Sequence, residues 1–200
     1  MELLFPDELN LLENPGFYQL KQRLSDKIQL LLGECSRELA PVIEAHADII
    51  PEHIRAIPPK ISRGENYLGF PWMILDQPRY FKNDDVFAIR TLCWWANSFS
   101  ITLQLAGPSL QRSLPGLTAA ATLLAGKGYY AGINKDPWLH HFGSDNYTRL
   151  SDSTNPAAII KTAAENGFLK IMQRITLDQY AELPSITPAF AQTVFQAIRR

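Results

Sequence analysis

One segment in the middle of the chain constrains the fold more than any other. Over residues 98–105, polar and apolar side chains alternate without exception. Successive side chains of a β-strand point to opposite faces of a sheet, whereas a helix repeats every 3.6 residues, so this alternation predicts a strand. The residues expected to be buried on its apolar face are Phe99, Ile101, Leu103 and Leu105. The residues expected to share its polar face are Ser98, Ser100, Thr102 and Gln104.

Two preceding segments are rich in aromatic and β-branched residues and also predict strands. With the alternating segment they give three consecutive antiparallel strands, at about residues 66–76, 86–95 and 98–106. Pro71 has no amide hydrogen to donate, so we expect it at a bulge or on an unpaired side. The residues around Arg63–Tyr67 and Asp76–Tyr80 are typical of turns, and 76–85 predicts a long hairpin connection.

A long helix is predicted near the N-terminus. Asn14 followed by Pro15 is typical of a helix start, because Asn caps free amides and Pro is tolerated at the first helical position. Apolar residues then recur every three or four positions as far as Leu39, and Pro41 is expected to weaken or end the helix.

The C-terminal half predicts further helices and strands. Asn155 and Pro156 repeat the helix-start pattern, residues 168–177 are typical of a last strand, and Thr187 with Pro188 is expected to open the terminal helix. The order of elements predicts an α+β fold with a mostly antiparallel sheet, packed by the long N-terminal helix and the C-terminal helices. The whole chain, residues 1–200, is expected to form a single globular domain.

Composition disfavours several classes of protein. The formal net charge is −1, so there is no broad positive field to attract nucleic acid. No stretch approaches the roughly 20 apolar residues of a membrane helix, and the N-terminus lacks a basic segment before an apolar run. Cys35 and Cys93 both lie in apolar patterns, which predicts free thiols. We therefore expect a cytoplasmic protein without nucleic-acid or membrane partners; composition assigns neither cofactor nor oligomeric state.

No nucleophile elbow, phosphate loop, dinucleotide fingerprint or metal-ligand spacing occurs in the chain. The stretch richest in ligand-binding side chains is residues 134–147. It supplies the catalytic candidates His140, His141 and Asp145, with an imidazole as general base. Adjacent histidines point in different directions, so the two are poorly placed to chelate one ion. The alternative is that one histidine packs while the other is solvated.

Arg90 interrupts an otherwise apolar strand, and a buried guanidinium is costly unless it is paired or stacked. If the 76–85 connection closes symmetrically, Arg90 lies across from Trp72, where stacking contributes about 0.5–2 kcal/mol. Arginines of this kind serve both structure and anion recognition. The ligand-binding candidates are Arg90, Trp72, Trp138, Ser100, Thr102 and Tyr147.

Three functional hypotheses follow. The first is a small-molecule-binding domain, with enzymatic activity left open, whose pocket lies near the 138–147 loop and the polar face of strand 98–104. The second is a non-catalytic interaction or scaffold protein, in which the aromatic residues serve packing or self-association. The third is a metal-dependent enzyme that uses His140 or His141 together with carboxylates from elsewhere in the chain.

Overall fold

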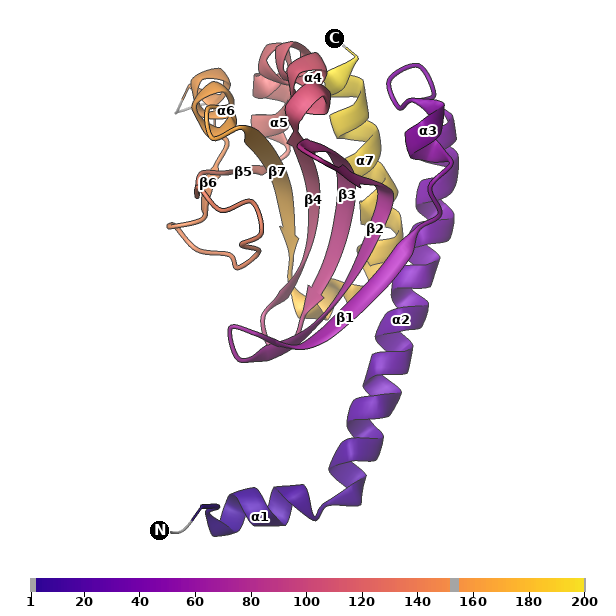
Figure 1. Ribbon diagram of the computed structural model, residues 1–200, viewed down its shortest axis with the longest axis vertical. Helices are drawn as coiled ribbons and strands as arrows, with labels where there is room; N and C mark the ends of the chain where they lie inside the picture. Colours follow the sequence, from indigo (N-terminus) through magenta and orange to yellow (C-terminus); the bar gives the residue numbers. More distant parts are fainter. Residues whose placement is uncertain (1–2, 152–154, 200) are drawn as a thin grey trace.

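The computed structural model describes residues 3–151 and 155–199. Within these residues, seven antiparallel strands form one sheet in the order β1-β2-β3-β4-β7-β5-β6 (Figure 1). The strands are β1 (Lys60–Tyr67), β2 (Phe70–Lys82), β3 (Asp85–Trp94), β4 (Ser98–Ala106), β5 (Tyr130–Gly132), β6 (Tyr147–Arg149) and β7 (Phe168–Ile175). The predicted α+β class is confirmed.

Helices cover one face of the sheet and connect its strands (Figure 1). They are α1 (Pro6–Leu12), α2 (Pro15–Glu44), α3 (Glu52–Arg55), α4 (Gly107–Ala119), α5 (Ala121–Gly126), α6 (Pro156–Ala164), the 3₁₀ helix η1 (Leu177–Glu182) and α7 (Leu183–Ile198). Helix α7 runs along the sheet beside α2, whereas α1 and the first turns of α2 extend well beyond the sheet (Figure 1).

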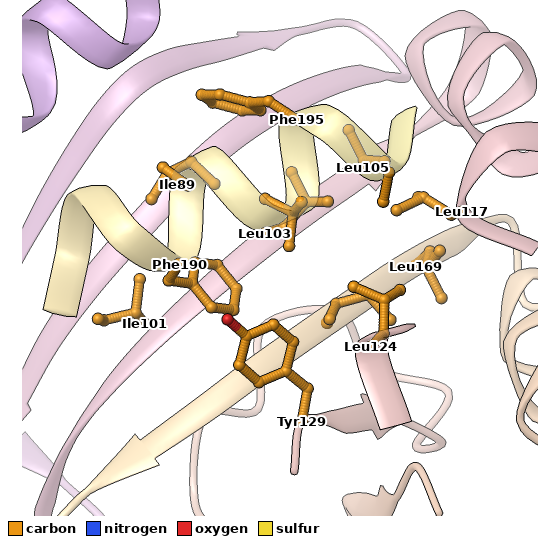
Figure 2. Packing of buried hydrophobic residues seen from close by; sticks show 14 of the residues in the cluster. Ile89, Ile101, Leu103, Leu105, Leu117, Leu124, Tyr129, Leu169, Phe190 and Phe195 are labelled. Atoms are coloured by element: carbon orange, nitrogen blue, oxygen red, sulfur yellow. The ribbon is translucent and has the colours of Figure 1, made fainter. Parts of the chain in front are cut away.

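The alternation in β4 sets the main core, as predicted. Ile101, Leu103 and Leu105 are completely buried and point toward α7, where Phe190 and Phe195 pack on the same side (Figure 2). The polar residues of β4 share the other face, also as predicted, but they are buried too. Both faces of this strand are therefore covered.

The predicted start of α2 is confirmed, because the side chain of Asn14 accepts a hydrogen bond from the amide of Phe17. Pro41 does not end the helix, which continues to Glu44. Leu39 and Ile43 are buried on either side of the proline, and this tertiary packing outweighs the one backbone hydrogen bond that Pro41 cannot make.

The β1–β2–β3 hairpins differ most from the prediction. The segment 63–67 belongs to a strand, β1, rather than to a turn, and β2 continues through residues 76–80 to Lys82. The β2–β3 hairpin closes at Asn83 and Asp84, since Lys82 already pairs with Asp85. A register irregularity between residues 76 and 79 lets β2 carry its turn-type residues without ending. Pro71 lies opposite a second irregularity, as expected for a residue without an amide hydrogen.

Two boundaries in the C-terminal half also differ. Helix α7 begins at Leu183 rather than at Thr187, because Pro184 already occupies a first-turn position and the side chain of Leu183 is completely buried. The short strand β6 was not predicted. It pairs with β5 through residues 147–149, and three residues are too few to show periodicity.

Candidate functional site

The polar face of the sheet carries a compact group of charged and hydrogen-bonding side chains. Strand register places Asp76, Arg90 and Thr102 side by side on β2, β3 and β4. In the next row of the same face, Gln104 lies beside Lys170 of β7. Directly opposite residues in an antiparallel sheet share one face, so the backbone pairing alone assembles this group.

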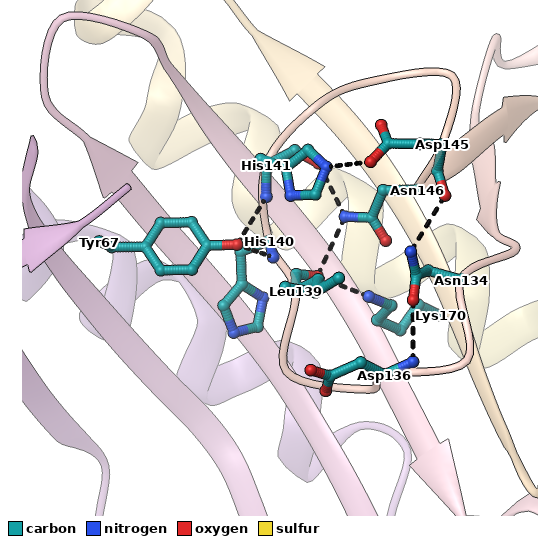
Figure 3. Close-up of polar contacts among 9 residues, drawn as sticks. All are labelled: Tyr67, Asn134, Asp136, Leu139, His140, His141, Asp145, Asn146 and Lys170. Carbon is teal, nitrogen blue, oxygen red and sulfur yellow. Dashed lines mark hydrogen bonds and ion pairs between the residues drawn. The ribbon is translucent and has the colours of Figure 1, made fainter. Parts of the chain in front are cut away.

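A loop between β5 and β6, residues 133–146, lies over Lys170 (Figure 3), and the members of the group are largely buried. The side-chain amide of Gln104 donates to the carbonyl of Pro137, and the ammonium of Lys170 donates to the carbonyl of Leu139 at 2.6 Å. Asn146, which is completely buried, donates to the carbonyls of Leu139 and His141. Backbone carbonyls of the loop thus accept hydrogen bonds from buried polar side chains, and ring contacts of Trp138 and Phe142 add to its packing.

Arg90 is mostly buried and paired, as predicted. Its Nε donates to Oδ1 of Asp76 at 2.7 Å, and its Nη1 donates to Oε1 of Gln104 at 3.1 Å. The guanidinium carbon lies 5.2 Å from the ring centre of Phe81 and 5.5 Å from that of Trp138. The side chain thus has both the carboxylate and the aromatic faces that a desolvated guanidinium requires.

The predicted contact between Arg90 and Trp72 is wrong. Trp72 pairs with Trp94, and Arg90 pairs with Asp76, four residues further along β2. The symmetric hairpin assumed from the sequence places the turn too early, since the turn lies at 83–84 rather than in the middle of 76–85. Trp72 packs instead with Tyr67 and Trp94 in a small apolar cluster on the same face, nearer the β3–β4 turn.

Lys170 was not singled out from the sequence, although it belongs to the same group. Its side chain is completely buried, and burial lowers the pKa of its ammonium to about 8. The nitrogen lies 5.0 Å from the ring centre of Tyr147. Gly132 makes room for the lysine stem, because a Cβ on this glycine would lie only 2.8 Å from Lys170 Cε. Among the described residues, no carboxylate forms an ion pair with Lys170, although the charge of Asp136 opposes part of the lowering of its pKa.

His140 faces this group from the loop (Figure 3). Its backbone amide donates to the hydroxyl of Tyr67 at 2.6 Å, and the two rings lie 6.0 Å apart. Burial lowers the pKa of the His140 imidazole to about 3, and the nearby charges of Arg90 and Lys170 lower it further in the same direction. His140 is therefore neutral at physiological pH.

His141 and Asp145 form a pair at the outer side of the loop, with Nε2 of the imidazole 2.8 Å from the carboxylate. This hydrogen bond lowers the pKa of the Asp145 carboxyl. The other ring nitrogen, Nδ1, is buried and has no hydrogen-bond partner among the described residues. Gly143 admits the carboxylate, because a Cβ there would lie 2.5 Å from Asp145 Oδ1.

The remaining candidates lie on the same face. Tyr147 is buried beside Lys170, its hydroxyl interacts with Thr102, and burial raises its pKa above the ordinary value. Ser100 is buried one row below, opposite Arg174. Trp138 is half-exposed and covers Arg90 from the loop. The structure therefore brings Arg90, Thr102, Tyr147 and His140 together and leaves Trp72 outside the group.

Asp76, Gln104 and Lys170 complete the group but were not candidates. A signal for Lys170 was present, because it stands between Leu169 and Ile171 in a predicted strand, as Arg90 stands in its own. Asp76 carried no such signal, since its position at the end of a predicted strand is typical of a turn residue.

A large apolar groove lies elsewhere on the molecule. It has a volume of about 610 Å³ and sits on the helix-covered side, between α2, η1 and the β3–β4 turn. Its walls include Leu24, Leu31, Trp95, Phe99 and Tyr180, and none of its lining residues belongs to the 138–147 loop. The prediction that this loop borders a ligand pocket stays a prediction.

Metal ligands do not converge at the loop. In residues 3–151 and 155–199, no three His, Cys, Asp or Glu side chains are grouped so that they would hold a metal ion. In the same ranges, no helix combines the length and the apolar character that crossing a bilayer requires.

Comparison of the chain with protein-family models, with curated proteins and with solved structures found no significant match.

Proposed function

We propose that this protein binds a small organic anion at the polar face of its sheet, beneath the 133–146 loop. The observation that carries the proposal is the charge balance of the buried group. Arg90 and Lys170 are both desolvated cations, and Asp76 is the carboxylate that pairs with Arg90. The carboxylate of Asp136 acts on Lys170 from the loop, but it is solvent-exposed and forms no ion pair with the ammonium. A buried ammonium whose hydrogen-bond acceptor is a neutral carbonyl favours an anionic partner.

The surrounding side chains suit such a ligand. Trp138, Phe81 and Tyr147 supply aromatic surface next to the two cations, while the hydroxyl of Thr102 and the neutral imidazole of His140 supply hydrogen-bonding groups. Small-molecule sites combine apolar walls with a few such polar groups. The ligand would replace the Leu139 carbonyl at Lys170, so binding requires the loop to shift.

Thermal-shift screening tests this proposal. The wild type is compared with Lys170→Met, His140→Ala and His141→Ala against a panel of small carboxylic acids and phosphate esters. A ligand at 100 times its dissociation constant stabilises a protein by about 2.7 kcal/mol. We expect this stabilisation in the wild type, its loss in Lys170→Met and its reduction in His140→Ala. Equal stabilisation of all four proteins, or of none, would contradict the proposal.

A second function, that of an interaction protein, is favoured by a different observation. Large apolar side chains are exposed along α1 and the first half of α2, far from the polar face. Exposed apolar surface of this extent typically marks a protein–protein contact.

A further inference from the structure

The N-terminal part of the chain forms an arm, residues 3–27, that projects from the folded body (Figure 1). Helix α2 has 30 residues and is on the order of 45 Å long. Its buried residues begin only at Ile28, and α1 has no buried residue. The arm touches the body through the ion pair between Lys21 and Glu65 of β1, and its apolar side chains gain little from that contact. Such an arm has little to stabilise it, because helices in proteins depend mainly on apolar tertiary contacts.

The arm is nevertheless rich in large apolar side chains. Its exposed members are Leu3, Leu4, Phe5, Leu9, Leu11, Leu12, Phe17, Tyr18, Leu20 and Leu24. On α2, Phe17, Leu20 and Leu24 continue the same side of the helix that Ile28 and Leu31 turn toward the body. One apolar stripe is thus covered by α7 and β2 over its second half, whereas over its first half Phe17, Leu20 and Leu24 stay exposed among the described residues.

The 610 Å³ groove begins where the arm leaves the body. Leu24 belongs to both the arm and the groove, whose other walls are formed by Trp95, Phe99, Leu177 and Tyr180. An apolar stripe and an apolar groove therefore lie end to end on one molecule, and the stripe cannot fold back into the groove because both are on the same continuous helix.

We propose that two copies of this chain associate about a two-fold axis near Leu24, each placing its arm in the groove of the other. In this antiparallel arrangement, the residues around Phe17 and Leu20 of one copy meet the groove around Leu31 and Tyr180 of the second copy. A two-fold contact uses the same surface on both copies, so the stripe and the groove are each filled once and the assembly closes as a dimer.

The exposed apolar area supports a second copy as the occupant, and the charge of α1 argues against a lipid surface. The exposed apolar side chains of the arm present on the order of 1,000 Å² per copy, against the ~800 Å² per partner of a standard stable interface. Residues 6–13 contain three acidic and no basic side chains, whereas residues 15–30 contain three basic and one acidic. The acidic α1 is poorly suited to an anionic lipid surface.

Analytical ultracentrifugation of the full chain tests the association. The chain has a mass of 22.6 kDa. We expect a dimer of about 45 kDa for the wild type. Leu24→Glu and Tyr180→Glu each place a charge in the interface, and we expect each to raise the dimer dissociation constant at least ~100-fold. Both side chains are exposed in the single chain, so far-UV circular dichroism should be unchanged.

Gln29→Glu is the matched control, since Gln29 is exposed on the opposite side of α2 and the substitution adds the same charge. It should remain dimeric. A monomeric wild type at about 200 µM, or a dimer that survives both Leu24→Glu and Tyr180→Glu, would overturn the proposal. Co-sedimentation of a monomeric wild type with phosphatidylcholine–phosphatidylglycerol vesicles would also overturn it and assign the arm to membranes.

Oxidative cross-linking tests the geometry. Both native cysteines, Cys35 and Cys93, are buried and should not react in the folded protein. Leu24→Cys places a thiol near the proposed axis, and Gln29→Cys places one away from it. We expect a covalent dimer from the first variant at least ~10-fold faster than from the second, because disulfides require Cβ atoms within about 4.5 Å. Equal rates would contradict the proposed arrangement.

Discussion

The two faces of the sheet are both buried, but they are buried by different means. On one face, Leu103 and Ile89 pack against helices in a continuous apolar core. On the other, Gln104 and Lys170 donate hydrogen bonds to the loop that covers them, and Arg90 lies against the loop's Trp138 ring. The stability that apolar packing contributes does not change with pH but is lost when a cavity is created. The stability that a buried polar group contributes depends on the charge of each partner. Substitutions on the two faces should therefore destabilise the protein in different ways.

The largest effect is expected from a cavity on the apolar face. Leu103→Ala removes a completely buried side chain from the centre of the core and should lower the free energy of unfolding by about 3–4 kcal/mol. Thr102→Ala, its neighbour on the polar face, should cost only about 1 kcal/mol. Urea denaturation of both variants measures the difference, and equal losses would show that the two faces are not distinct.

Breaking the ion pair on the polar face should cost nearly as much. Asp76→Ala leaves the Arg90 guanidinium buried without its carboxylate and should lower the free energy of unfolding by about 3 kcal/mol. The double variant Asp76→Leu with Arg90→Met removes both charges and should recover most of that loss. If the double variant is as unstable as the single one, packing rather than charge explains the effect.

Lys170 should make the free energy of unfolding rise at alkaline pH. Its pKa is lowered to about 8 in the folded protein, so between pH 8 and the ordinary lysine pKa the unfolded chain binds more protons than the folded one. The free energy of unfolding should therefore gain about 1 kcal/mol from this group between pH 8 and 9. Subtracting the pH profile of Lys170→Met isolates the gain, because the buried cysteines titrate in both proteins. If the difference in unfolding free energy between the two proteins does not change with pH, the ammonium is not desolvated.

His140 should have a smaller effect, a fall in the free energy of unfolding at acidic pH. Its pKa is lowered to about 3 in the folded protein, so the unfolded chain takes up the proton first as the pH falls below the ordinary histidine pKa of about 6.5. The wild type should lose about 1 kcal/mol between pH 7 and 5, a discounted figure because His140 is half-buried. His140→Gln should lose less over the same range. Chemical denaturation at the two pH values compares them.

Local sequence determined much of this fold. The strict alternation of 98–105 placed each β4 side chain on its face, and the Asn-Pro pairs at 14–15 and 155–156 marked the starts of α2 and α6. These features succeed because periodicity and capping depend on residues within one or two turns of the chain. The isolated charge of Arg90 in an apolar strand likewise predicted a buried, paired guanidinium. An unpaired guanidinium carries a desolvation cost wherever such a strand is covered.

Tertiary structure alone decided the rest. The partner of Arg90 depends on the register of the β2–β3 hairpin. The two-residue turn and the register irregularity in β2 place Asp76 opposite Arg90, four positions beyond the expected Trp72. The extension of β2 through turn-type residues and of α2 through Pro41 depends on packing by distant segments. Lys170 joins Gln104 and Leu139 only when β7 and the 133–146 loop meet on one face. Contacts between residues far apart in the chain leave no local pattern, so the assembly of the polar group became visible only in three dimensions.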